Sequence, residues 1–184
     1  MKTSLFVAAA LATVCASAAS AGTIVFTGNT SGGPLWNRPI QGNPPTPPAS
    51  GVGTAVAYRF HQFAVDANGA YSFQSTAVGG WDNYAFLYSN SFNPLTPFAN
   101  VIVGNDDNPL IGLAGFTTNL TAGTTYFLVI TGYENIDAGA YSAEIRGPGN
   151  IAAVPEPESW ALMIGGFALA GGALRVRRSR IAYA

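Results

Sequence analysis

The sequence predicts an all-β protein whose central domain is an antiparallel β-sandwich, jelly-roll-like, of about eight strands. Short runs of alternating apolar and polar residues recur from Thr54 onward, and each run is bounded by Gly, Asn or Asp. The same region shows no helical period. Gly, Ser, Thr, Asn and aromatic residues dominate its composition, which favours strands and turns over helices.

The chain begins with a stretch typical of a secretory signal peptide, residues 1–21, which we expect to be helical. Lys2 precedes an apolar run, and the small residues Ala19-Ser20-Ala21 follow it, as signal peptidases require. Cleavage is expected after Ala18 or Ala21. The single cysteine, Cys15, lies inside this leader, so the mature protein is expected to have no disulfide.

Residues 22–53 form a lead-in to the sandwich. The lead-in opens with "GTIVFT", a β-branched and aromatic run that predicts a short first strand. Six prolines and five glycines follow within residues 28–51. This composition predicts a long loop without regular structure.

The sandwich domain itself is predicted to span residues 54–150. Its first two strands, 55–65 and 70–75, are separated by Asp66-Ala67-Asn68-Gly69, which predicts a hairpin. The run 125–132 is apolar on both faces, so we expect a central strand covered on both sides. The remaining predicted strands are 83–89, 99–103, 113–120 and 139–147.

Charge is sparse in the mature domain and slightly acidic. Residues 22–150 hold three arginines and seven acidic residues, which are Asp66, Asp82, Asp106, Asp107, Glu134, Asp137 and Glu144. A basic patch is missing from this sequence, so nucleic acid is not an expected partner.

The order of motifs over residues 55–147 resembles the bacterial pre-peptidase C-terminal type of β-sandwich. The matching features are Tyr71 and Phe73, Asp82 before Leu87-Tyr88, Asn105-Asp106-Asp107, Leu120 to Tyr126, and Gly139 to Tyr141. Domains of this family are non-catalytic accessory modules of secreted proteins. The resemblance therefore implies a binding or structural role.

A calcium site is one interpretation of the densest polar cluster. Asp82, Asn105, Asp106 and Asp107 offer the hard oxygen ligands that calcium prefers, and the fold could bring Asp82 to the others. The alternative is a turn capped by its own Asn and Asp side chains. An EF-hand is excluded, because no glutamate stands at the twelfth position of a loop begun at Asp106 or Asp107.

Two further residues bear on function. Trp81, beside Gly79-Gly80, is the candidate for an exposed platform that binds sugar rings, such as those of an extracellular polysaccharide. His61 is the only histidine, and the sequence carries no motif of a hydrolase around it or elsewhere. We therefore do not expect an enzyme. A secreted hydrolase remains an alternative that ranks below a structural role and a binding role.

The C-terminal segment 154–180 combines three features. Pro155-Glu156-Pro157 precedes an apolar run, for which we expect a transmembrane helix over 159–176. The run is short compared with the ~20 residues of a full span. A basic stop follows, formed by Arg175, Arg177, Arg178 and Arg180, which would hold this end in the cytoplasm.

The segment that combines the Pro-Glu-Pro triplet, the apolar helix and the arginine cluster resembles the PEP-CTERM sorting signal of Gram-negative bacteria. The resemblance implies recognition by an exosortase-type processing enzyme and cleavage near the triplet. It also implies export across the inner membrane, a membrane-held intermediate, and a final place at the cell surface or in an extracellular polysaccharide or biofilm matrix. A permanent C-terminal anchor remains the alternative.

Overall fold

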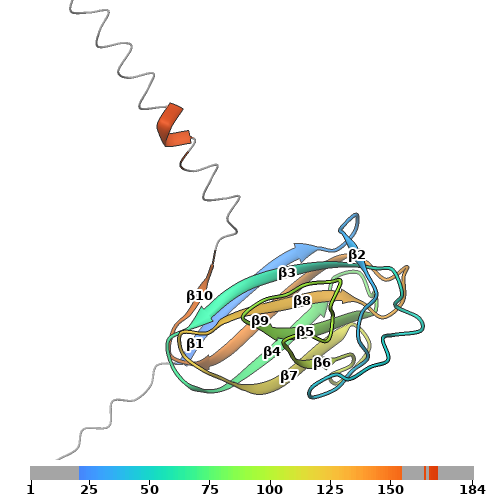
Figure 1. Ribbon diagram of the computed structural model, residues 1–184, viewed down its shortest axis with the longest axis horizontal. Helices are drawn as coiled ribbons and strands as arrows, with labels where there is room; N and C mark the ends of the chain where they lie inside the picture. Colours follow the sequence, from blue (N-terminus) through green and yellow to red (C-terminus); the bar gives the residue numbers. More distant parts are fainter. Residues whose placement is uncertain (1–20, 155–163, 165, 170–184) are drawn as a thin grey trace, which may run out of the picture.

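The computed structural model describes residues 21–154, 164 and 166–169 (Figure 1). The predicted signal helix lies outside this range except for Ala21. Residues 21–154 form ten strands: β1 (Ala21–Asn29), β2 (Leu35–Trp36), β3 (Val56–Val65), β4 (Gly69–Ala77), β5 (Asn83–Ser89), β6 (Val101–Asn105), β7 (Leu113–Leu120), β8 (Thr125–Gly132), β9 (Ala140–Pro148) and β10 (Ile151–Ala153).

The strands form two antiparallel sheets. One sheet has the order β1-β9-β4-β7 and the other has the order β10-β3-β8-β5-β6, with β2 also paired to β3. The chain crosses from one sheet to the other at most connections, and this order of eight long strands is that of a jelly roll. The all-β prediction is confirmed. The strand number is ten rather than eight, because β2 and β10 add two short strands along β3.

The predicted hairpin at residues 66–69 is wrong. Strand β3 pairs with β8 in the larger sheet, whereas β4 pairs with β7 and β9 in the smaller one. The turn between them therefore carries the chain across the sandwich. A turn signal specifies a reversal of chain direction but does not specify that the flanking strands pair.

The main core lies between the two sheets. Tyr71, Tyr141 and Ile145 from the smaller sheet meet Phe63 and Leu128 from the larger one, and all five are at most 2% exposed. The inward positions of β9 alternate as its sequence predicts. Burial of apolar side chains from both sheets holds the sandwich together without a disulfide.

A second apolar cluster covers the outer face of the larger sheet. It comprises Trp36, Val56, Tyr58, Tyr84, Phe86, Tyr88 and Val129. Strand β8 thus contributes Val129 to this cluster and Leu128 to the main core. The prediction of a central strand covered on both sides is confirmed.

The proline-rich lead-in supplies part of this cover. Prolines and glycines do prevent a long strand there, but the prediction of no regular structure is wrong at β2, where Leu35 and Trp36 pair with β3. The Trp36 indole lies 5.5 Å from the ring of Phe86 and 5.4 Å from that of Phe92. Its Nε1 donates to Thr131 Oγ1 over 3.0 Å. The segment is therefore packed onto the sheet.

Both ends of the sandwich leave from the same side. Ala21 pairs with Pro148, which is followed by β10, and the amide of Val154 donates to Gln62 O over 2.9 Å. Beyond Val154 the described residues are 164 and 166–169, which are helical (Figure 1). No helix within the described residues is long and apolar enough to cross a membrane. Most of the predicted span 159–176 lies outside them.

Candidate functional site

Three carboxylates meet at one end of the sandwich. Strand β5 begins directly after Asp82, and β6 ends directly before Asp106. Because β5 and β6 are antiparallel neighbours in which Ala85 lies opposite Asn105, the start of one strand and the end of the other are adjacent. Carboxylate oxygens of Asp82, Asp106 and Asp107 all lie within 4.8 Å of one another. The structure therefore brings Asp82 close to Asp106 and Asp107, while their role as metal ligands stays a prediction.

Burial and mutual repulsion disfavour the ionised form of this group. Desolvation is the main cause that raises the pKa of Asp106 to about 6, and the charges of Asp82 and Asp107 add to it. Burial also raises the pKa of Asp82, and the charges of Asp107 and Asp137 add to it. Among the described residues, the Oδ1 atoms of Asp82, Asn105 and Asp106 are buried and have no hydrogen-bond partner.

This oxygen set fits a calcium ion. Calcium takes six to eight oxygen ligands, and carboxylates that are close together and poorly hydrated are stabilised when a cation joins them. Asp82, Asp106 and Asp107 would supply carboxylate oxygens, and Asn105 adds an amide oxygen beside them. Among the described residues, the Oδ1 atoms of Asp82, Asn105 and Asp106 do not cap a backbone N–H group.

Two more acidic residues raise the local negative charge. The loop after β8 carries Glu134 and Asp137, and both contribute to the raised pKa of Asp82. The amide of Tyr133 donates to Asp82 O over 3.0 Å, which fixes this loop beside the cluster. Five of the seven acidic residues of the domain thus gather at one end.

Arg38, from the lead-in, is the cation that faces them. Its side chain is only 1% exposed. Nη2 and Nε donate to Tyr133 O over 2.6 and 3.2 Å, and Nη1 donates to Pro39 O over 2.9 Å. Arg38 was not predicted as a site residue, although it is the one charged residue between positions 28 and 51.

An open pocket of about 410 Å³ adjoins the carboxylate cluster. Arg38, Tyr84 and Asp106 line it, together with Tyr133 and residues of the lead-in. We call it the Arg38 pocket. Asp106 belongs both to the carboxylate cluster and to this pocket.

Trp81 is partly buried rather than fully exposed. Its Nε1 donates to Ala140 O over 2.9 Å, and the ring packs so closely on Gly139 that an added Cβ there would lie 2.6 Å from it. The indole also contacts the main core. Its role as a sugar platform stays a prediction. Trp36 is also buried, at 4% exposed.

His61 faces the interior between the sheets. Its ring stacks on Phe26 with 4.5 Å between the centroids, and Nε2 lies 2.8 Å from the Tyr141 hydroxyl. Burial lowers its pKa to about 4. The imidazole is therefore neutral at physiological pH and serves packing.

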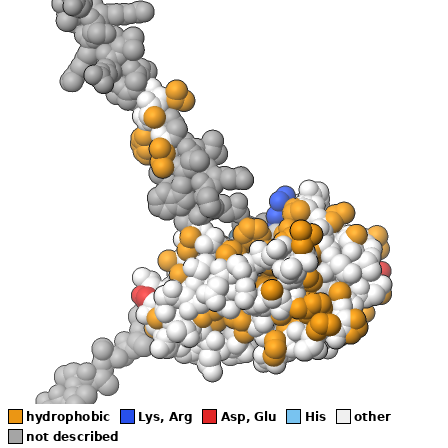
Figure 2. All heavy atoms as spheres, viewed as in Figure 1, with side chains coloured by type: hydrophobic (Ala, Val, Ile, Leu, Met, Phe, Trp, Pro, Cys, Tyr) orange, Lys and Arg blue, Asp and Glu red, His pale blue; other side chains and the backbone are white. Residues whose placement is uncertain are grey.

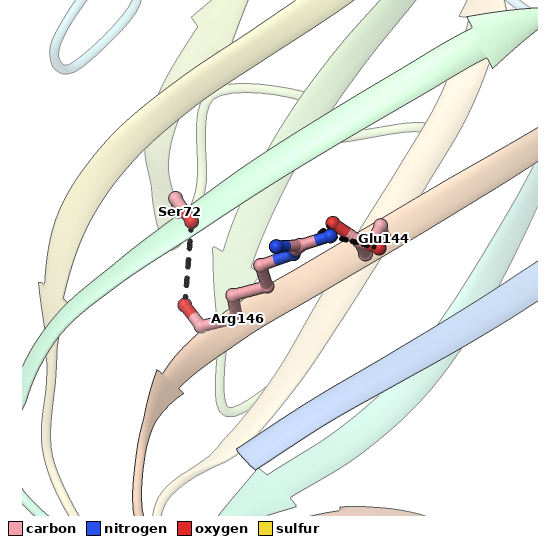
Figure 3. Close-up of polar contacts among 3 residues, drawn as sticks. All are labelled: Ser72, Glu144 and Arg146. Carbon is pink, nitrogen blue, oxygen red and sulfur yellow. Dashed lines mark hydrogen bonds and ion pairs between the residues drawn. The ribbon is translucent and has the colours of Figure 1, made fainter. Parts of the chain in front are cut away.

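The outer face of the smaller sheet carries polar side chains on β4 and β9. Figure 3 shows the Arg146 guanidinium paired with the Glu144 carboxylate along β9, and Ser72 Oγ of β4 donating to Arg146 O over 3.5 Å. Such an exposed ion pair contributes little to stability. Figure 2 shows one face of the molecule, where hydrophobic side chains are scattered and charged ones are few. Among the described residues, the carboxylate cluster brings three acidic side chains together.

Comparisons with known proteins show no family for this chain. Neither a protein-family model nor a curated protein matches the sequence. Among solved structures, the pre-peptidase C-terminal domain of collagenase from Bacillus anthracis is 14% identical with a TM-score of 0.42, covering 67% of this chain and 89% of that one. CBM35 from Cellvibrio japonicus Abf62 is 13% identical with a TM-score of 0.36, covering 72% and 99%. A Cowpea mosaic virus top component is 11% identical with a TM-score of 0.31, covering 78% and 96%. Likenesses at this level carry no argument about function.

The predicted sorting residues lie outside the described part of the chain. These are Pro155, Glu156 and Pro157 and the arginines 175, 177, 178 and 180. Their roles stay predictions from the sequence.

Proposed function

We propose that this chain is an exported, non-catalytic module with a structural or adhesive role in a polysaccharide matrix at the cell surface. One observation carries the proposal: a jelly roll that closes within residues 21–154 is flanked in the sequence by an export leader and by a triplet, apolar run and arginine cluster. Strand β10 ends at Ala153, just before Pro155. A processing enzyme could therefore remove the segment after the triplet without removing any strand.

In this proposal the C-terminal segment acts first as an anchor and then as a cleavage signal. The apolar run holds the exported domain at the inner membrane, and the arginines fix its orientation. An exosortase-type enzyme then reads Pro155-Glu156-Pro157. Proline disfavours helix at and before its position, and a non-helical peptide would suit binding in a protease-like cleft.

Cell fractionation tests the sorting step. The wild-type chain is expected in the surface or matrix fraction, and a variant with Pro155, Glu156 and Pro157 all replaced by Ala is expected to remain in the inner membrane. Glu158→Ala is the matched control, because it removes a neighbouring acidic residue outside the triplet. Equal distribution of the triple variant and the wild type would contradict the proposal.

A second candidate function, calcium-dependent binding, is favoured by the carboxylate cluster. Asp82, Asp106 and Asp107 have oxygens within 4.8 Å of one another, and two of these residues have a buried oxygen without a partner among the described residues. A cation that binds the folded state alone stabilises it by ~2.7 kcal/mol at a concentration 100 times its Kd.

Thermal melting with calcium and with chelator tests this candidate. Calcium is expected to raise the melting midpoint of the wild type and not that of Asp106→Asn. Glu144→Gln, which removes a carboxylate from the outer face of the smaller sheet, is expected to respond like the wild type. An unchanged melting midpoint of the wild type would contradict calcium binding.

A further inference from the structure

We propose that two copies of this chain pair through the free edge of β1 and form a two-fold symmetric dimer. The proposal goes beyond the function proposed above and does not depend on cleavage of the C-terminal segment. Strands β1 and β7 are the two edges of the smaller sheet, and β1 pairs with β9 alone among the described strands. An edge strand presents a row of unpaired N–H and C=O groups, to which another strand can bind.

Other parts of the chain cover the remaining sheet edges. In the larger sheet, the short strands β2 and β10 pair along β3. At the edge of β6, Gly42 and Gly104 exchange backbone hydrogen bonds of 3.0 and 2.9 Å. Asn108 caps the first part of β7, because its amide donates to Leu113 O and its Nδ2 donates to Gly115 O over 3.1 Å. Short edge strands and loop contacts of this kind protect β proteins from edge-to-edge pairing.

The hydrogen bonds at the end of β1 show which of its backbone groups face outward. Thr30 N donates to Gly139 O over 3.0 Å, in register with the pairing of β1 and β9. Asn29 O, one residue earlier, accepts from Arg59 Nε over 3.3 Å on the opposite side. Backbone groups of successive residues in a strand point to opposite edges, so the odd-numbered positions of β1 point away from β9.

Three of these positions, Thr23, Val25 and Thr27, form the free part of the edge. Their outward N–H and C=O groups have no hydrogen-bond partner among the described residues. Their side chains are exposed, and that of Val25 is 52% exposed. The strand contains no charged residue and no proline, which are common means of keeping an edge strand single. Its sequence therefore permits pairing with another strand.

A second copy of β1 fits this edge best in one antiparallel register. With Val25 of the first copy opposite Val25 of the second, Thr23 lies opposite Thr27 in both directions, and every free backbone group finds a partner. Other registers leave some of these groups unpaired. On the inner face, Ile24 would lie opposite Phe26 of the second copy, and each is partly buried against the main core of its own domain. The pairing would therefore bury apolar surface and use the same patch on both copies, as a two-fold interface does.

Strand β10 does not lie on the two-fold axis of this dimer. The start of β1 is where β10 approaches it, since a Cβ on Gly22 would lie 3.5 Å from Ile151 Cγ1. An axis through Val25 places the starts of the two β1 strands, and with them the two β10 strands, at opposite ends of the interface. The two four-stranded sheets would then continue as one sheet. Because only residues 23–27 of each copy pair, we expect a weak dimer of the small class that buries less than ~1,200 Å².

Sedimentation equilibrium over a wide range of concentrations tests the proposal on the protein purified from the cells that produce it. We expect the apparent mass of the wild type to rise with concentration towards that of a dimer. Val25→Lys and Val25→Glu each place like charges opposite one another, so each variant alone should dimerise at least about tenfold more weakly. An equimolar mixture of the two should dimerise again, because Lys then faces Glu. Val25→Thr keeps a β-branched residue and is the matched control, which should dimerise like the wild type.

Hydrogen exchange of the backbone amides locates the interface. The amides of Thr23, Val25 and Thr27 should exchange more slowly at high than at low protein concentration. The amides of Ile24 and Phe26 face β9 and should be protected at both concentrations, which makes them the internal control.

A wild type that stays monomeric at every concentration would overturn the proposal. A dimer that persists unweakened in folded Val25→Lys would also overturn it, since that result is expected if β1 were exchanged between copies or if the shared termini associated. Failure of the Lys and Glu variants to dimerise when mixed would count equally against it. Thermal melting verifies that each variant folds. The measurement does not involve Pro155-Glu156-Pro157, so its failure and that of the fractionation test are distinguishable.

Discussion

The guanidinium carbon of Arg38 lies 4.2 Å from the centroid of the Tyr84 ring. This contact joins the proline-rich lead-in to β5 at the edge of the carboxylate cluster. The other face of Tyr84 stacks on Phe86 with 4.7 Å between centroids. The lead-in is thereby fixed to the sheet that positions Asp82 and Asp106, and its substitution should affect both stability and the site.

Replacing Arg38 tests this connection. Arg38→Met keeps the apolar stem but leaves the carbonyls of Pro39 and Tyr133 without their donors, so we expect a loss of about 3 kcal/mol in the free energy of unfolding. Arg38→Lys should not restore it, because a single ammonium cannot reproduce the planar fork. Urea unfolding of both variants gives the comparison. If Arg38→Met had the same free energy of unfolding as the wild type, the contacts of Arg38 would not contribute to stability.

Because the lead-in is packed on the sheet, substitutions of its neighbouring residues Leu35 and Trp36 should differ in their effect on stability. Trp36→Ala is expected to cost about 3–5 kcal/mol of stability, since the indole is buried among aromatic rings and bonded to Thr131. Leu35→Ala is expected to change stability by less than ~0.5 kcal/mol, because Leu35 is 62% exposed. Denaturant titration distinguishes the two. Similar small effects would mean that the segment is loosely attached.

His61 should make the domain less stable in acid. Its pKa falls from 6.5 to about 4 on folding, so the native state binds fewer protons than the unfolded state between these values. The stability contribution is present above about pH 6.5 and is lost as the pH falls towards 4. His61→Phe keeps a ring against Phe26 and should reduce this loss. Melting midpoints across this pH range, and the imidazole titration by NMR, provide the measurement. An ordinary titration near 6.5 in the folded protein would contradict the prediction.

In the metal-free protein, Asp106 should make the domain less stable as the pH rises, which is opposite to the effect of His61. Its pKa is raised from 3.8 to about 6, so its contribution is full below about 3.8 and is lost as the pH rises through 6. Asp106→Asn should remove this trend. Calcium must displace the proton, so its apparent affinity should fall below about pH 6. Calcium titrations at several pH values, with Glu144→Gln as the control, test this. Affinity independent of pH would exclude Asp106 as a ligand.

The alternation of apolar residues predicted most of the architecture. Strand β8 illustrates why: its two apolar faces required a central position, and it lies between β3 and β5. The turn at 66–69 shows the limit, because local turn chemistry does not determine which strands pair across two sheets. The long-range packing of Trp36 and Arg38 could not be predicted from the sequence either. The proline and glycine content of the lead-in indicates its backbone conformation but not the contacts of its side chains.

The candidate site was predicted in part for a similar reason. Asp106 and Asp107 are neighbours in sequence, and Asp82 was included because its carboxylate could join them through the fold. Glu134 and Asp137 come from a loop more than twenty residues later, and only the jelly-roll order places that loop beside β5. Arg38 joins them from the opposite end of the domain sequence. No local sequence motif indicates that this loop or Arg38 lies beside the carboxylates.

The intact mass of the mature protein recovered from cells tests the proposed sorting step. We expect a chain that begins after Ala18 or Ala21 and lacks residues 158–184, because both the leader and the segment beyond the Pro-Glu-Pro triplet have been removed. A mass that still includes residues 158–184 would contradict sorting by cleavage and would make the C-terminal segment a permanent anchor.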